Sequence, residues 1–153
     1  MLNAVSCITN LLYYDTASSP LLEPKQRALI FTTLNTKQFL LATKNEEIQI
    51  ETVRVMSNLS RHSQLCEEYF TTDELFLKTL VLVLDHTLRD LVFYSVGIII
   101  NISLHAKVRP ALMEHNVVSK LIEVLRDANL EDMELAKVAA KAIHNLQGID
   151  KVS

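Results

Sequence analysis

Four asparagines close apolar stretches of the chain, and their side chains can bond a peptide backbone. The stretches read SCITNLLYY, RVMSNLSRH, GIIINISLH and KAIHNLQGI, and the asparagines are Asn10, Asn58, Asn101 and Asn145, spaced by 48, 43 and 44 residues. A carboxamide offers two N–H donors and one acceptor oxygen. At a helix end it can cap the last carbonyls, bond the backbone of an adjacent unit, or contact a bound partner, and these roles are compatible.

The residues around each asparagine repeat with it. One position later stands an aliphatic residue (Leu11, Leu59, Ile102, Leu146), and six positions earlier a small one (Ala4, Thr52, Ser95, Ala139). One helical turn before each asparagine stand Ser6, Arg54, Gly97 and Lys141. These offsets trace one face of a helix of roughly 14 to 16 residues. We expect a neighbouring helix to cross at the small residues, and Asn45, Thr87 and Asp132 to cap the helix starts.

Shorter helical patterns separate the long helices. They cover 64–70 and 73–84 in one interval, and 109–115 and 117–127 in the next. The first interval is less regular, with 23–34 and 36–44 preceded by a loop over 15–24. Pro110 suits a first helical turn, where its missing N–H leaves no bond unmade. The chain therefore alternates two shorter helices with one long helix.

Composition supports an all-helical fold. Of the 153 residues, 49% are hydrophobic and only two are Gly and three Pro, too few for the many turns of a sheet protein. The net charge of −3 disfavours nucleic acid as a partner. Cys7 and Cys66 form no CxxC pair, so we expect two reduced core thiols in a cytoplasmic protein.

The sequence offers little for catalysis, metal binding or membrane insertion. The longest apolar stretch without Asp, Glu, Lys or Arg, 91–106, has 16 residues and is short for a membrane span. His62 and Cys66 stand four residues apart but supply only two of the three or four ligands that zinc needs. No Ser/His/Asp grouping, Gly-rich phosphate loop or HExxH motif appears. We expect no enzyme activity, no metal or cofactor, no small-molecule substrate and no membrane insertion.

Three helices per unit of about 43 residues, the third long and ending in Asn-Leu, resemble the armadillo repeat. The resemblance implies a right-handed α-solenoid with an orphan third helix over 1–14 and repeats over about 20–62, 63–105 and 106–148. One departure is that Thr72-Asp73 and His115-Asn116 stand where family members often carry Gly. Because an orphan third helix lacks its own first and second helices, we expect a longer array or a contact with another chain.

The resemblance also implies a partner groove lined by the third helices, where the asparagines bond the backbone of an extended ligand. The predicted groove residues are Asn10, Asn58, Asn101, Asn145, Arg54, Lys141, Arg61 and Tyr94. The basic residues among them predict an extended acidic or neutral peptide as partner. The chain has no Trp, which nuclear transport receptors often carry in this groove.

The stretches ETVRVMSNLS, SVGIIINIS and LIEVLRD look similar to C-terminal repeats of the family's ciliary and flagellar branch. That similarity implies a non-catalytic scaffold or adaptor in axoneme assembly, located in the cytoplasm and in the cilium or flagellum. Two alternatives stay open. One is a GTPase-regulating module of the exchange-factor kind, which a nucleotide-release assay would distinguish, and the other is a nuclear transport adaptor, which the missing Trp disfavours.

Overall fold

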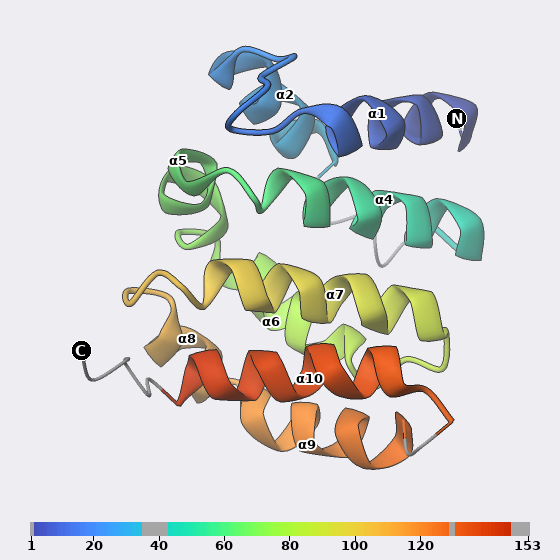
Figure 1. Ribbon diagram of the computed structural model, residues 1–153, viewed down its shortest axis with the longest axis vertical. Coiled ribbons are helices and arrows are strands. Elements are labelled where there is room, and N and C mark those ends of the chain that lie inside the picture. Colours follow the sequence, from blue (N-terminus) through green and yellow to red (C-terminus); the bar gives the residue numbers. More distant parts are fainter. Residues whose placement is uncertain (1, 35–42, 129–130, 148–153) are drawn as a thin grey trace. The chain divides into compact units, whose positions relative to one another are not determined.

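The computed structural model describes residues 2–34, 43–128 and 131–147 (Figure 1). Every regular element within these ranges is a helix, as the composition predicts. The chain forms two compact units, Met1–Phe76 and Leu77–Ser153, and the boundary between them falls within one helix. Among the described residues, no helix has both the length and the apolar character needed to cross a membrane.

The first unit is built around two long helices that lie side by side. Its elements are α1 (Leu2–Tyr14), α2 (Pro24–Leu34), α4 (Glu46–Leu59), α5 (Ser63–Leu65), the π-helical η1 (Cys66–Phe70) and the start of α6 (Glu74–Val83). Helix α1 packs along α4, and α2 contacts α4 and α5 (Figure 1). The expected helix over 36–44 lies outside the described residues except for Thr43 and Lys44, which are not helical.

Three phenylalanines hold α2 against the end of the first unit. The ring of Phe31 lies 4.6 Å from that of Phe70 and 5.9 Å from that of Phe76, and the latter two rings meet edge to face at 5.3 Å. All three side chains are buried. Offset and edge-to-face aromatic pairs contribute beyond their buried area, so this cluster fixes the position of α2.

The second unit repeats the pattern of a long helix covered by shorter ones. It comprises α7 (Arg89–Ile102), α8 (Arg109–Glu114), α9 (Val117–Ala128) and α10 (Met133–Leu146), with most of α6. Helix α10 packs against both α7 and α9, and α8 contacts α9 (Figure 1). Pro110 occupies the first turn of α8, as expected.

The long helices have the predicted length, and two of their three predicted caps are confirmed. Helices α4, α7 and α10 have 14 residues each. The side chains of Asn45 and Asp132 accept hydrogen bonds from the third helical N–H groups of α4 and α10. The predicted cap at Thr87 is wrong, because α7 begins one residue later than expected and Leu88 takes the cap position. The ring of His86 accepts a bond from the Leu88 N–H instead.

The turn between α8 and α9 explains why no glycine is needed there. Asn116 has φ of 58°, in the left-handed region that glycine usually occupies and that asparagine tolerates. The equivalent turn before α6 is built differently. There the π-helical turn of η1 precedes Asp73, whose carboxylate accepts a bond from the Phe76 N–H at 2.9 Å.

Three of the four repeated small residues are buried, as a close helix contact would require. Thr52, Ser95 and Ala139 are fully buried, and the two hydroxyls bond carbonyls of their own helices at 2.7 and 2.8 Å. Ala4 in α1 is exposed.

Cys66 is buried as expected, but the prediction of a core thiol at Cys7 is wrong. Cys7 is exposed, because no described element covers that side of α1.

Candidate functional site

The predicted asparagine ladder bonds neighbouring backbone in the first unit. The Asn58 amide Nδ2 on α4 donates to the backbone oxygen of Thr9 on α1 at 3.3 Å. The hydroxyl of Thr9, itself buried, can donate to the Glu51 carboxylate at 2.9 Å or to the Val5 oxygen at 3.0 Å. A polar seam of Asn58, Thr9 and Glu51 therefore joins α1 to α4.

The same contact recurs in the second unit. The Asn145 amide on α10 donates to the backbone oxygen of Ile100 on α7 at 3.2 Å. In both units the acceptor is the residue immediately before the preceding asparagine of the ladder. Both side chains are half-buried, and no described residue bonds the carboxamide oxygen of Asn58 or of Asn145. Each amide thus serves the fold through its nitrogen.

The remaining ladder residues differ in their surroundings. Asn10 on α1 is exposed. Asn101 and Tyr94 on α7 are half-buried, and both take part in contacts within the protein. The Tyr94 ring lies edge to face with that of Phe93, with centroids 5.5 Å apart. That these residues contact a partner stays a prediction.

The two basic residues one turn before the asparagines differ in exposure and in ion pairing. Arg54 on α4 pairs with the Glu51 carboxylate on the same helix, and its side chain is 37% exposed. Lys141 on α10 is exposed, and no described carboxylate pairs with it. The positive charge predicted for this face is therefore stronger at Lys141 than at Arg54.

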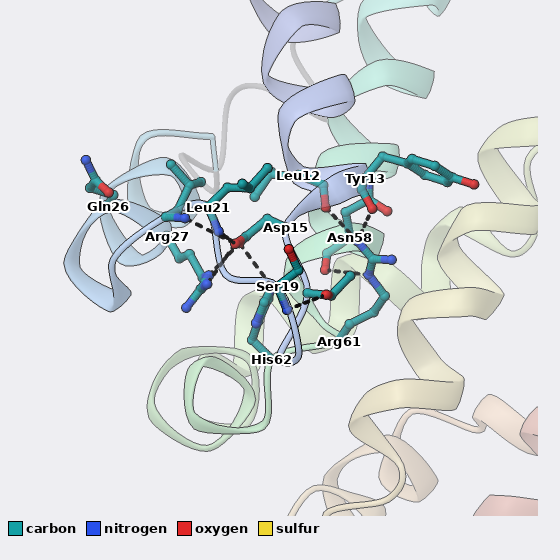
Figure 2. Close-up of polar contacts among 12 residues, drawn as sticks. Leu12, Tyr13, Asp15, Ser19, Leu21, Gln26, Arg27, Asn58, Arg61 and His62 are labelled. Carbon is teal, nitrogen blue, oxygen red and sulfur yellow. Dashed lines mark hydrogen bonds and ion pairs between the residues drawn. The ribbon is translucent and has the colours of Figure 1, made fainter.

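Arg61, also predicted to face a partner, binds the end of α1. Its Nη2 donates to the backbone oxygens of Leu12 at 2.6 Å and Tyr13 at 3.2 Å, and its Nε to that of Asn58 at 3.2 Å (Figure 2). The last carbonyls of a helix lack partners within it and carry partial negative charge. Arg61 therefore caps α1, a role its position in the sequence did not predict.

Next to this cap lies a buried carboxylate that sequence reasoning missed. Asp15 is fully buried and accepts hydrogen bonds from the backbone N–H groups of Leu21 and Leu22 at 2.7 and 3.1 Å (Figure 2). Arg27 on α2 adds a two-pronged ion pair, with nitrogen–oxygen distances of 2.6 and 2.8 Å. One side chain thus fastens the end of the loop and α2 to the end of α1. The only signal in the sequence is an acidic residue at the end of an apolar helix, which is common.

His62 completes this cluster. Its Nε2 lies 3.3 Å from Oδ2 of Asp15, in a geometry that makes no hydrogen bond, and the side chain is 9% exposed. Hydrogen bonds from Arg27 hold the pKa of Asp15 well below its ordinary value, and the Asp15 carboxylate raises the pKa of Arg27. Burial, reinforced by the charge of Arg27, lowers the pKa of His62 against the opposing pull of Asp15. This lowered pKa favours the neutral form of the imidazole.

The Cys66 thiol is buried and favours its protonated, unreactive form. It donates its S–H to the Ser60 oxygen at 3.0 Å, and burial raises the pKa of its thiol to about 12. Within residues 2–34, 43–128 and 131–147, no three His, Cys, Asp or Glu side chains gather closely enough to hold a metal ion.

Comparison with known proteins accounts for the repeated helices. No family model matches the chain. It is 30% identical over 145 residues to armadillo repeat-containing protein 2 of Mus musculus, and equally so to the proteins of that name from Bos taurus and Homo sapiens. The chain has the armadillo-type fold. The aligned segment is 95% of this chain, so the armadillo resemblance read from the ladder is confirmed.

The armadillo relatives are much longer than this chain. The chain spans 16% of the length of each of the three proteins. The similarity supports a protein-interaction scaffold, because armadillo units present extended surfaces.

Proposed function

We propose that the chain is a non-catalytic protein-interaction scaffold whose long-helix face binds an extended acidic or neutral segment of a partner. The observation that carries this proposal is that each ladder amide bonds through its nitrogen and not through its oxygen. Asn58 and Asn145 each donate to a neighbouring helix, yet the carboxamide oxygen of each has no described partner and the side chain stays half-exposed. An oxygen so placed can accept from a backbone N–H of an extended peptide.

The strength of such binding depends on charge as well as on the ladder. A hydrogen bond contributes about 0.5–1.5 kcal/mol net, so a few amides alone give weak binding. Lys141 is exposed and unpaired among the described residues, and Arg54 is partly exposed, so both can attract a carboxylate. Tyr94, half-buried on α7, is the aromatic residue that we expect on this face. These features favour an acidic partner over a basic one.

Charge reversal tests the proposal. The probes would be fluorescein-labelled acidic, neutral and basic peptides without helix-forming patterns. A length of about 12 residues is enough for an extended peptide to pass several helices. Fluorescence anisotropy would be measured as the protein is titrated into each peptide. The double variant Arg54→Glu/Lys141→Glu should abolish binding of the acidic peptide. The matched control Lys25→Glu/Lys107→Glu makes the same charge change at exposed positions that are not among the predicted groove residues, and it should bind as the parent does. Equal affinity for basic peptides, or unchanged affinity in the first variant, would overturn the proposal.

The cellular role we propose is that of an adaptor in the assembly of the ciliary or flagellar axoneme, acting in the cytoplasm and cilium. Its support is the resemblance noted for three stretches of the sequence and the similarity to armadillo repeat-containing protein 2 over 95% of the chain. A tagged chain expressed in multiciliated cells should enrich axonemal components in proximity labelling. Labelling indistinguishable from that of a diffuse cytoplasmic control would contradict this role.

We also propose that α1 is the third helix of a further repeat, whose other helices lie in a longer array or in another chain. Leu11 on α1 is 41% exposed, whereas its equivalents Leu59, Ile102 and Leu146 are at most 5% exposed. Cys7, one turn earlier on that side, is also exposed. Adding an amphipathic helix pair designed against this side should protect Cys7 from alkylation, and unchanged alkylation would count against the arrangement.

A further inference from the structure

A cavity of about 280 Å³ lies within the second unit, away from the ladder. It opens where α7 and α10 begin and α9 ends, whereas the ladder asparagines stand near the other ends of the long helices. Buried aliphatic side chains form its walls, among them Leu84, Val92, Val124 and Leu135. Small-molecule sites usually occupy about 300–1,000 Å³, so this cavity is small for a metabolite but has room for one long side chain.

The charge at the cavity rim is asymmetric. Arg89 is held by Asp132, with nitrogen–oxygen distances of 2.7 and 2.9 Å, and its guanidinium carbon lies 4.7 Å from the centre of the Phe93 ring. The positive charge of Arg89 is therefore already neutralised by the Asp132 carboxylate. Asp127 and Glu131 also line the cavity, are exposed and have no described ion-pair partner. The rim thus has two carboxylates in excess.

We propose that this cavity is a docking site for a single lysine or arginine side chain of a partner protein. Both side chains carry an apolar stem that packs on hydrophobic surface while the charged end stays near water. In this cavity the stem would lie on the walls formed by Val92, Val124 and Leu135, and the charged end would meet Asp127 and Glu131. Acidic side chains would be repelled by the same rim. The site differs from the ladder face in position and in preferred charge, so it stands independently of the function proposed above.

Amino-acid amides provide a direct probe. The protein would carry ¹³C-labelled Leu and Val methyl groups, and N-acetyl-arginine methylamide, N-acetyl-lysine methylamide and uncharged N-acetyl-norleucine methylamide would be titrated in turn. The two basic probes should shift the methyl signals of Leu84, Val92, Val124 and Leu135 in a saturable way. Because exposed ion pairs each contribute little, Asp127→Asn/Glu131→Gln should weaken their binding by roughly threefold to tenfold.

The control variant Glu47→Gln/Glu114→Gln removes the same charge at exposed positions outside the cavity and should leave binding unchanged. All four substitutions lie on the surface, so each variant should fold as the parent does, which circular dichroism would verify. Equal binding of the norleucine probe, or an unchanged affinity in Asp127→Asn/Glu131→Gln, would overturn the proposal in favour of a purely apolar site. Absence of saturable shifts up to the solubility limit of the basic probes would overturn it altogether.

Discussion

The side-chain amide of Asn58 donates a hydrogen bond to the backbone oxygen of Thr9, which lies 49 residues earlier on the adjacent long helix. Asn145 bonds Ile100 in the same way in the second unit. The asparagine therefore ties one long helix to the next through a contact that apolar packing alone would not fix in register. Since the carboxamide oxygen is not used in this contact, the same residue can also accept a hydrogen bond from a partner.

Asn58→Ala should lower the free energy of unfolding by about 1–2 kcal/mol, because it removes a hydrogen bond and leaves the oxygen of buried Thr9 without its side-chain donor. Asn58→Asp should cost more, since a carboxylate oxygen would face the Thr9 oxygen. Urea unfolding followed by circular dichroism measures both. Asn10→Ala, at an exposed ladder position, serves as control and should change stability by less than about 0.5 kcal/mol. Equal losses at positions 10 and 58 would contradict this role.

Asp15→Asn should be among the most damaging single substitutions in the first unit. It leaves the Arg27 guanidinium, only 11% exposed, beside a neutral amide, and breaking a buried pair by removing one partner costs about 3–5 kcal/mol. Chemical denaturation gives the loss, and Asp73→Asn, which changes an acidic residue in a more open turn, provides the comparison. If the free energy of unfolding fell by the same small amount in both variants, the Asp15 cluster would not hold the loop as described.

The Asp15 cluster also predicts how stability depends on pH. His62 has a folded pKa below its ordinary value of 6.5, so the unfolded chain takes up the proton first, and stability should fall as pH drops below about 6.5. The slope from this one group cannot exceed about 1.4 kcal/mol per pH unit. Asp15 has a lowered pKa as well, so its contribution is complete above the unfolded value near 3.8 and is lost only at more acidic pH.

Replacing the histidine separates these two ranges. His62→Gln should flatten the decline in stability that begins below about pH 6.5, while leaving the loss of stability below the ordinary Asp pKa of 3.8 in place. Urea midpoints measured across pH 3 to 8 give both ranges. An unchanged slope in His62→Gln would show that another group titrates.

The turn residue Asn116 offers a backbone test. Asn116→Ala should destabilise the second unit by about 1 kcal/mol, because a Cβ without a polar side chain is strained at φ of 58°. Asn116→Gly should be neutral or slightly stabilising, since glycine adopts this conformation freely. Thermal unfolding monitors both variants. Equal melting temperatures for the alanine and glycine variants would contradict the left-handed assignment.

The repeated pattern of the sequence predicted the long helices well, because their spacing, burial and asparagine ends are properties of each helix itself. It could not predict the Asp15 cluster. That cluster depends on a loop returning Leu21 and Arg27 to the end of α1, and the loop has no counterpart in the other repeats. The capping role of Arg61 escapes the sequence pattern for a related reason, because it depends on where α1 ends. That Arg61 also contacts a partner stays a prediction.

If the ladder asparagines serve the fold and a partner at once, replacing two of them should lower both stability and affinity in one paired measurement. Asn58→Ala/Asn145→Ala would be compared with the parent for both unfolding free energy and affinity for the acidic peptide, at a temperature where both proteins are fully folded. We predict lower stability together with an affinity about fivefold to a hundredfold weaker, as expected for two lost hydrogen bonds. Lower stability with unchanged affinity would contradict this dual role and confine the asparagines to the fold.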